Sequence, residues 1–344
     1  FLILPEHGDI EEESKQKNIE FAVVPCFTQL YYYKPQWKYL ALPILVAHAY
    51  LRLPKLKDIA QKFAPDLIYS NTSAENLGIK IAKALNVKHI SHIREFMDLD
   101  HDAKYIFGRK RKKKYINQSD GVIYVSNSVA NHVNMGEPLK EWQRVIYNGV
   151  DTVDWEYSDK SIPEELNLGV VGIFDPEKGQ DVAIRMMPSI LMCYPKAKLH
   201  VWGDKEGKYK KRLYSMVNQM ELEENVMFHG FEKNPNIIYK DMDILMMCSR
   251  SEGFGRVTVE AMQRAIPVLG YKSGGTSELV KDGFNGYSFL TQEDCVCGLK
   301  KMLSSETEFN KLRKNAYDDA RTNYTVDLYC SRVEAFVEMI MKNK

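Results

Sequence analysis

The sequence predicts an α/β protein built from two doubly wound parallel sheets. Short apolar stretches that predict strands alternate with stretches that predict helices along the 344 residues. The stretch 244–275 shows the unit most clearly: an apolar strand (244–248), a loop with glycines (249–255), a helix, and a second strand (267–271). A chain of this length suggests two domains, each large enough to bury a core of its own.

The composition argues against several classes of protein. Lysine plus arginine (47) nearly balance aspartate plus glutamate (46), so no overall charge favours nucleic acid as a partner. The six cysteines contain no C-x-x-C pair, which argues against a disulfide framework or a structural zinc site and fits a reducing, cytosolic setting. The apolar runs are too short to span a bilayer, so we expect a cytoplasmic protein that is at most peripheral to a membrane.

The first domain is expected over residues 1–151. Its predicted strands are a buried strand at 1–5 and further strands at 21–24, 65–71, 88–92 and 120–126, with helices at 6–20 and 74–85. The strand, helix and strand over 65–92 predict a right-handed crossover between parallel strands. Residues 27–53 hold a cluster of aromatic side chains, which suits packing in the core and loops or, alternatively, a lipid–water boundary.

Residues 109–114 are six consecutive cations. A solvated helix face is the plainer interpretation, but like charges repel one another, and an anionic membrane attracts each by about 1 kcal/mol near its surface. We therefore also expect an anionic membrane surface as a partner of 109–114. A nuclear localisation signal is the remaining alternative.

The second domain is expected over residues 152–325, and its first part, 152–165, is polar and suits a hinge. Strands are predicted at 168–172, 198–202 and 226–230, ahead of the unit at 244–275. Asp241 and Asp243 have the D-x-D spacing of some metal sites, but a helix end and a strand start explain them better. We expect no metal site in the chain.

The loop and helix at 249–260 predict an anion site. A helix that begins at Phe254 or Gly255 leaves its first amides without intrahelical partners and places the positive end of its dipole there. Glycines at 253 and 255 allow a ligand to approach the main chain. Glu252 precedes the helix, and Glu260 lies about 8 Å further along it.

Two carboxylates that flank a diphosphate match the layout of a nucleotide-sugar, which carries hydroxyls at both ends. The plainer interpretation of Glu260 is an ion pair with Arg256 four residues earlier. Glu252 alone would be a helix-start acid that satisfies the dipole.

The run EGFGRVTVEAM, with Glu252 and Glu260 as its E-x7-E pair, resembles the donor motif of the retaining glycosyltransferases of the GT-B fold, family four (glycosyl transferases group 1), of the bacterial surface-polysaccharide type. The resemblance covers nearly the whole chain. It includes NGVD at 148–151, the segment at 172–180 and GG-x-x-E at 274–278.

The resemblance implies two Rossmann-like domains that face each other across a cleft. The acceptor side would be 1–151, the donor side 152–325, and a last helix within 326–344 would cross back to the first domain. One β–α unit would precede residue 1. The implied reaction is a retaining transfer of a hexose from a nucleotide-sugar, with UDP as the expected carrier, to a hydroxyl of a glycan or lipid-linked acceptor in polysaccharide biosynthesis. No metal or other cofactor is implied.

The resemblance also assigns roles. Glu252 would bind hydroxyls of the donor sugar, and His92, at the end of the strand 88–92, would face that sugar as a second catalytic residue. The donor would be held by Lys178, Gly253, Phe254, Gly255, Arg256, Val257 and Glu260. Ile173 departs from the family pattern, which usually has an arginine there, and its presence predicts weaker donor binding or a larger contribution from Arg256 or another basic group.

Three other functions share this architecture, and one of them, a glycogen-type enzyme, would be distinguished by a substrate assay. A non-catalytic partner subunit is suggested by Ile173 and by the β–α unit expected ahead of residue 1. A nucleotide-sugar epimerase would need acid and base carboxylates that the sequence does not identify.

Overall fold

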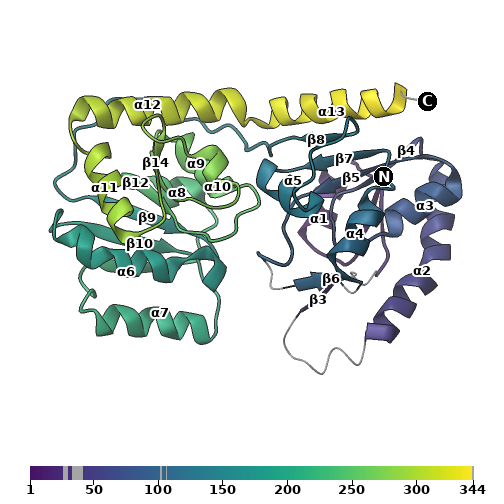
Figure 1. The fold of residues 1–344 in the computed structure, drawn as a ribbon, viewed down its shortest axis with the longest axis horizontal. Helices are drawn as coiled ribbons and strands as arrows, with labels where there is room; N and C mark the ends of the chain where they lie inside the picture. Colours follow the sequence, from purple (N-terminus) through teal and green to yellow (C-terminus); the bar gives the residue numbers. More distant parts are fainter. Residues whose placement is uncertain (26–29, 33–41, 101–102, 106, 343–344) are drawn as a thin grey trace. The chain divides into compact units, whose positions relative to one another are not determined.

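The structure is a computed structural model that describes residues 1–25, 30–32, 42–100, 103–105 and 107–342 (Figure 1). Its contacts divide the chain into two compact units. The first unit contains Phe1–Val125, Val129–Ile146 and Val333–Lys344, and the second contains Ser126–Ser128 and Tyr147–Arg332.

The first unit is built on a sheet of four parallel strands. Their order is β4 (Leu67–Ser70), β5 (Lys88–Ile93), β7 (Gly121–Tyr124) and β8 (Gln143–Val145). Two smaller pairs accompany it: β1 (Leu2–Leu4) with β2 (Phe21–Val23) in parallel, and β3 (Leu30–Tyr32) with β6 (Ala103–Tyr105) in antiparallel. The helices are α1 (Asp9–Gln16), α2 (Leu42–Phe63), α3 (Leu77–Leu85), α4 (Gly108–Ile116) and α5 (Asn127–Asn134).

The crossover predicted over 65–92 is confirmed as β4, α3 and β5, with β4 and β5 parallel. The apolar side of α3 explains why this segment is a helix, because Leu77 and Ile81 join Val24, Leu56 and Ala60 in one buried cluster. Each leucine, isoleucine or valine of this cluster contributes roughly 1.5–3 kcal/mol when it is fully buried. The helix begins three residues later than expected. The amide of Gly78 donates to the Glu75 carboxylate, and this bond replaces the backbone bond that the amide would make in an additional first turn.

The prediction of a buried strand at 1–5 is wrong for most of its side chains. Leu4 is buried, whereas Phe1 and Ile3 are 40% and 36% exposed. The strand alternates between a covered and an open face, as a strand with one buried face does. An apolar run cannot by itself distinguish this case from a strand buried on both faces.

Part of the aromatic stretch at 27–53 lies outside the described residues, so its two interpretations stay predictions. Within the described ranges, no helix combines the length and the apolar character that crossing a bilayer requires.

The second unit is built on a sheet of six parallel strands. Their order is β11 (Val226–Gly230), β10 (Lys198–Trp202), β9 (Asn167–Val171), β12 (Ile244–Met247), β13 (Val268–Tyr271) and β14 (Gly286–Phe289). The strand order runs outward in both directions from β9 and β12, so the chain reverses its direction of winding between these two strands. In open parallel sheets, ligands bind at the carboxyl ends of the strands beside such a switch point.

Helices cover both faces of this sheet. In Figure 1, α6 (Gln180–Leu191) and α7 (Lys208–Gln219) lie on one side, and α9 (Arg256–Met262) and α12 (Glu306–Asn323) lie on the other. The remaining helices are α8 (Pro235–Tyr239), α10 (Thr276–Leu279), α11 (Gln292–Met302) and α13 (Val326–Lys342), with a 3-10 turn at Pro176–Lys178. The later part of α13 belongs to the first unit, where Phe336 and Ile340 pack against Gly121 of β7.

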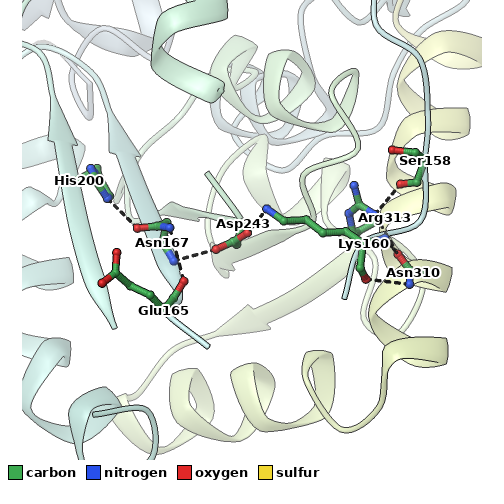
Figure 2. A network of polar contacts seen from close by, with 8 residues as sticks. All are labelled: Ser158, Lys160, Glu165, Asn167, His200, Asp243, Asn310 and Arg313. Atoms are coloured by element: carbon green, nitrogen blue, oxygen red, sulfur yellow. Dashed lines mark hydrogen bonds and ion pairs between the residues drawn. The ribbon is translucent and has the colours of Figure 1, made fainter. Parts of the chain in front are cut away.

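A buried carboxylate joins the starts of two strands to the segment that precedes the sheet (Figure 2). Asp243, 3% exposed, accepts from the amide of Asn167 at 2.8 Å and from the ammonium of Lys160. The backbone of Lys160 is bonded in turn to Asn310, whose side chain accepts from the Lys160 amide at 2.8 Å. Asp243 therefore has a structural role, which confirms the interpretation of Asp241 and Asp243 as a helix end and a strand start.

We predict that Asp243→Ala destabilises the second unit by about 3 kcal/mol, because it leaves a buried amide and a lysine without their acceptor. Urea unfolding measures the change. Asp241→Ala, at an exposed position two residues earlier, is the matched control and should stay within about 0.5 kcal/mol of the wild type. Equal stabilities of the two variants would contradict this role of Asp243.

Candidate active site

Two loops meet at the switch point of the second sheet, one after β9 and one after β12. The amide of Arg250 donates to the carbonyl of Glu177 at 2.9 Å, and the Ser251 hydroxyl donates to the Glu177 carboxylate at 3.1 Å. Gly179 has a φ of +71°, and a Cβ there would lie 2.1 Å from the carbonyl oxygen of Cys248. A side chain at 179 would therefore push the two loops apart.

The contact of these loops brings Lys178 and Glu252 together. The Lys178 ammonium donates to the Glu252 carboxylate at 2.8 Å, and the two side chains are 34% and 17% exposed. The 3-10 turn that carries Lys178 is capped by Asp175, whose carboxylate accepts from the amide of Glu177 at 3.1 Å. A cation and an anion thus face each other at the edge where this fold binds ligands.

The loop of Glu252 rests on a pair of glycines. The amide of Gly275 donates to the carbonyl of Glu252 at 2.6 Å. Gly274 has a φ of +53°, and a Cβ there would lie 2.5 Å from the Glu252 carbonyl oxygen and 2.9 Å from its nitrogen. The G-G pair therefore fixes the position of the Glu252 backbone.

Helix α9 begins at Arg256, after Gly255, close to the start that the sequence predicted. Its first amides have no partner within the helix. Phe254 is buried and packs near the rings of Tyr147 and Tyr324, so its side chain is not available to a ligand. Arg256 is exposed and Val257 is partly buried.

Glu260 has two partners, one of which the sequence did not reveal. Its carboxylate accepts from the Tyr239 hydroxyl at 3.0 Å and lies 3.5 Å from the Arg256 guanidinium. The expected ion pair with Arg256 is therefore present but long. Tyr239 is buried beneath the Arg264 guanidinium, and burial raises the pKa of its hydroxyl well above the ordinary value. The only signal of its role was a tyrosine within the apolar run 237–239, which must find a partner for its hydroxyl when buried.

His92 lies in the first unit, at the end of β5, and its side chain is fully buried. Its Nδ1 is 2.7 Å from the Tyr69 hydroxyl. Burial, with the charge of Arg94, lowers the pKa of His92 to about 3, so the ring is neutral at physiological pH. Its role toward a donor sugar stays a prediction.

Ile173 lies in the loop after β9 and is 51% exposed. Gln180 fastens this loop, since its amide nitrogen donates to the carbonyls of Gly172 and Ile173 at 3.2 and 2.9 Å. The position is thus at the edge of the site, without the cation that the family pattern places there.

The basic run 109–114 forms helix α4, but it is not a uniform solvated face. Lys112 is 5% exposed and donates to the carbonyl of Glu75 at 2.8 Å and to Asn76 at 2.5 Å, and burial lowers the pKa of its ammonium to about 8. Arg109 and Lys113 donate to backbone carbonyls of α5. The exposed cations that remain for a partner are Lys110, Arg111 and Lys114.

Comparison with known protein families identifies the chain. A model described as "Glycosyltransferase Family 4" matches residues 8–154, and one described as "Glycosyl transferases group 1" matches residues 155–319. An uncharacterized glycosyltransferase of Methanocaldococcus jannaschii is 30% identical over 272 residues, which are 77% of this chain and 72% of that protein.

The chain belongs to the group 1 glycosyltransferases. A mannosyltransferase of lipopolysaccharide core biosynthesis from Rhizobium meliloti is 26% identical over 67% of this glycosyltransferase and 68% of its own length. The crystal structure of the Anabaena protein HepE in complex with UDP superposes with a TM-score of 0.78, covers 98% of this chain and 92% of that one, and is 23% identical. This likeness confirms the predicted two-domain α/β fold of the GT-B type.

We predict that Gly274→Ala lowers transferase activity by at least tenfold, because the new Cβ displaces the backbone of Glu252. Initial rates with the preferred donor measure the loss. Gly283→Ala is the control, since Gly283 also has a positive φ, of +71°, but its Cβ would make only an ordinary contact of 3.5 Å with Tyr287. Similar losses in both variants would show backbone strain rather than displacement of Glu252.

We also predict that the first unit loses stability below pH 6.5. Burial lowers the pKa of His89 to about 4 and that of His92 to about 3. Below pH 6.5 these histidines are therefore protonated in the unfolded chain while they are still neutral in the folded unit. The free energy of unfolding is then unaffected by these groups above pH 6.5 and falls below it, by up to about 1.4 kcal/mol per pH unit for each histidine. The contribution of His89 levels off near pH 4.

Urea unfolding at pH 7, 6, 5 and 4.5 measures this dependence. In His89→Gln the amide can replace the ring's bonds to Ser70 and Ser119, and the variant should lose one proton from the slope. A variant that matches the wild-type slope would refute the assignment to His89.

Proposed function

We propose that this glycosyltransferase is a retaining hexosyltransferase that moves a sugar from a nucleotide-sugar to a hydroxyl of a glycan or lipid-linked acceptor in surface-polysaccharide biosynthesis. The observation that carries the proposal is the pair Lys178 and Glu252, 2.8 Å apart at the switch point of the second sheet. A donor that enters there meets a cation for its diphosphate and a carboxylate for its sugar hydroxyls.

The diphosphate is held by Lys178 and by the amides of 253–256, which are fixed before the donor arrives. At the other end, Glu260 accepts from the ribose hydroxyls, and Tyr239 holds its carboxylate in place at 3.0 Å. Val257 packs beside the ribose. A UDP-sugar is the proposed donor, and the Anabaena structure with UDP supports this choice.

In the transfer, the bond between the anomeric carbon and the diphosphate oxygen breaks, and the acceptor oxygen bonds to the same face of that carbon. The acceptor proton passes to the departing phosphate oxygen. Charge on the leaving group is the largest demand, and Lys178 with the helix-start amides meets it. We propose that these fixed groups suffice without a metal ion or another cofactor.

Glu252 and His92 are the proposed catalytic residues. Glu252 accepts hydrogen bonds from hydroxyls of the donor sugar once the Lys178 ammonium binds the diphosphate instead of Glu252. His92 is the second proposed catalytic residue. It is neutral and held by Tyr69, and a neutral ring donates or accepts one hydrogen bond without adding charge.

Ile173 stands where the family pattern usually has an arginine. One cation of the family pattern is absent beside the diphosphate, and Arg256, 65% exposed at the start of α9, is the proposed substitute. Arg256 is free to reach toward the ligand because its contact with Glu260 is 3.5 Å long and solvated.

We further propose that the protein works in the cytoplasm at the inner face of a membrane. The cysteines of the described ranges are free thiols, which fits a reducing compartment. The exposed cations of α4, beside the exposed Phe107, suit contact with anionic lipid.

Binding and turnover of UDP-, GDP- and ADP-sugars test the donor site, with Lys178→Ala and Glu260→Ala measured beside the wild type. We expect one nucleotide to bind saturably and both variants to weaken binding at least tenfold, because each removes a charged partner of the donor. Lys205→Ala removes a lysine paired with Asp175 at the rim and is the matched control. No binding of any donor would overturn the proposal.

A further inference from the structure

Three arginines converge on one buried carboxylate beside the loop that carries Glu252. Asp181, in the first turn of α6, is 3% exposed and is bonded to Arg185 four residues later. The guanidiniums of Arg212 from α7 and of Arg250 from the loop after β12 lie 3.9 and 3.7 Å from the same oxygen. Three chain segments thus bring their cations to a single anion.

The single carboxylate of Asp181 cannot neutralise the three guanidiniums. Its other oxygen accepts from the Tyr209 hydroxyl at 2.9 Å. Burial alone would raise the pKa of Asp181, but bonds from Arg185 and Tyr209 and the charge of Arg250 lower it overall, so its charge is negative and fixed. One negative charge beside three positive charges leaves an excess of two.

Neighbouring carboxylates do not remove the excess. In the loop before α7, Asp204 and Glu206 lie 2.8 and 2.6 Å from Lys210, and Asp175 pairs with Lys205 at 3.2 Å. Among the described residues, Asp181 is the one carboxylate within 4 Å of the three guanidiniums.

The positive surface continues along α7. Lys208, at the start of the helix, is exposed and stands four residues before Arg212, which places both cations on the same face of α7. The three guanidiniums remain accessible, with 43%, 59% and 47% of the side chains of Arg185, Arg212 and Arg250 exposed. The cluster therefore faces solvent and can be reached by a ligand.

We propose that Arg185, Arg212 and Arg250 form a second anion site, which binds phosphoryl groups of a polyanionic ligand. The planar guanidinium matches the paired oxygens of a phosphoryl group, and several guanidiniums on one group favour it over a single carboxylate. Lys208, on the same face of α7 as Arg212, favours a ligand with more than one phosphoryl group. The site shares no residue with the Lys178 and Glu252 pair, and the proposal does not depend on which nucleotide binds at that pair.

Titration calorimetry with inorganic tripolyphosphate tests the site in the full chain. The double variant R185Q/R212Q removes two guanidiniums and keeps Arg250 and the packing around Asp181. We expect its Kd to rise at least tenfold, while Lys178→Ala retains this binding event. The single variant Arg212→Gln should raise the Kd about threefold and is the safeguard if the double variant fails to fold.

Lys210→Gln is the matched control, because its ammonium is already paired with Asp204 and Glu206. Loss of tripolyphosphate binding in Lys178→Ala but not in the double variant would overturn the proposal, and so would equal losses in Lys210→Gln. Absence of binding to the wild type would overturn it as well. Nucleotide-sugar binding is measured separately. If the donor site fails, nucleotide-sugars do not bind, whereas tripolyphosphate still binds and still depends on the arginines.

A glycerol-phosphate oligomer identifies the source of the phosphoryl groups. Competition by the oligomer, lost in R185Q/R212Q, would assign the site to a phosphodiester-bearing acceptor. Binding of tripolyphosphate alone, with the same dependence on the arginines, would assign it to a free polyphosphate.

Discussion

The candidate donor site depends on the backbone contact between the loops after β9 and β12. Gly179 lies against the carbonyl of Cys248 with no room for a side chain, and this contact brings Lys178 within 2.8 Å of Glu252. Neither charge could be placed so closely by its own loop, since loops position side chains less accurately than packed backbone does. The glycines at 274 and 275 fix the second loop from the other side.

A second contact positions the backbone at the opposite ends of these strands. Asp243 binds the amide at the start of β9 and the ammonium of Lys160, and thereby ties the linker to the sheet. A buried carboxylate contributes little net energy when it is paired, but it allows few alternative arrangements of the backbone it binds. The sheet therefore presents β9 and β12 in a fixed register to the loops at their carboxyl ends.

Charge is divided between structure and surface in a way that composition conceals. The chain is nearly neutral overall, yet Arg185, Arg212 and Arg250 gather around one carboxylate in the second unit. In the first unit, a run of six cations in α4 is partly used for internal contacts. Lys112 is buried and bonded to Asn76, and Arg109 and Lys113 donate to carbonyls of α5. A cation in a sequence is thus evidence of a partner, and the partner is often the protein itself.

The sequence by itself determined the parallel α/β class, the strand, loop and helix at 244–262, and the family, because periodicity and a long motif are local properties. It did not determine that Phe1 and Ile3 are exposed, that Tyr239 supports Glu260, or that Lys112 is buried. The arginine cluster was equally hidden, since Asp181, Arg212 and Arg250 come from three separate segments. Contacts between distant segments depend on packing, and only the tertiary structure decides which side chains it brings together.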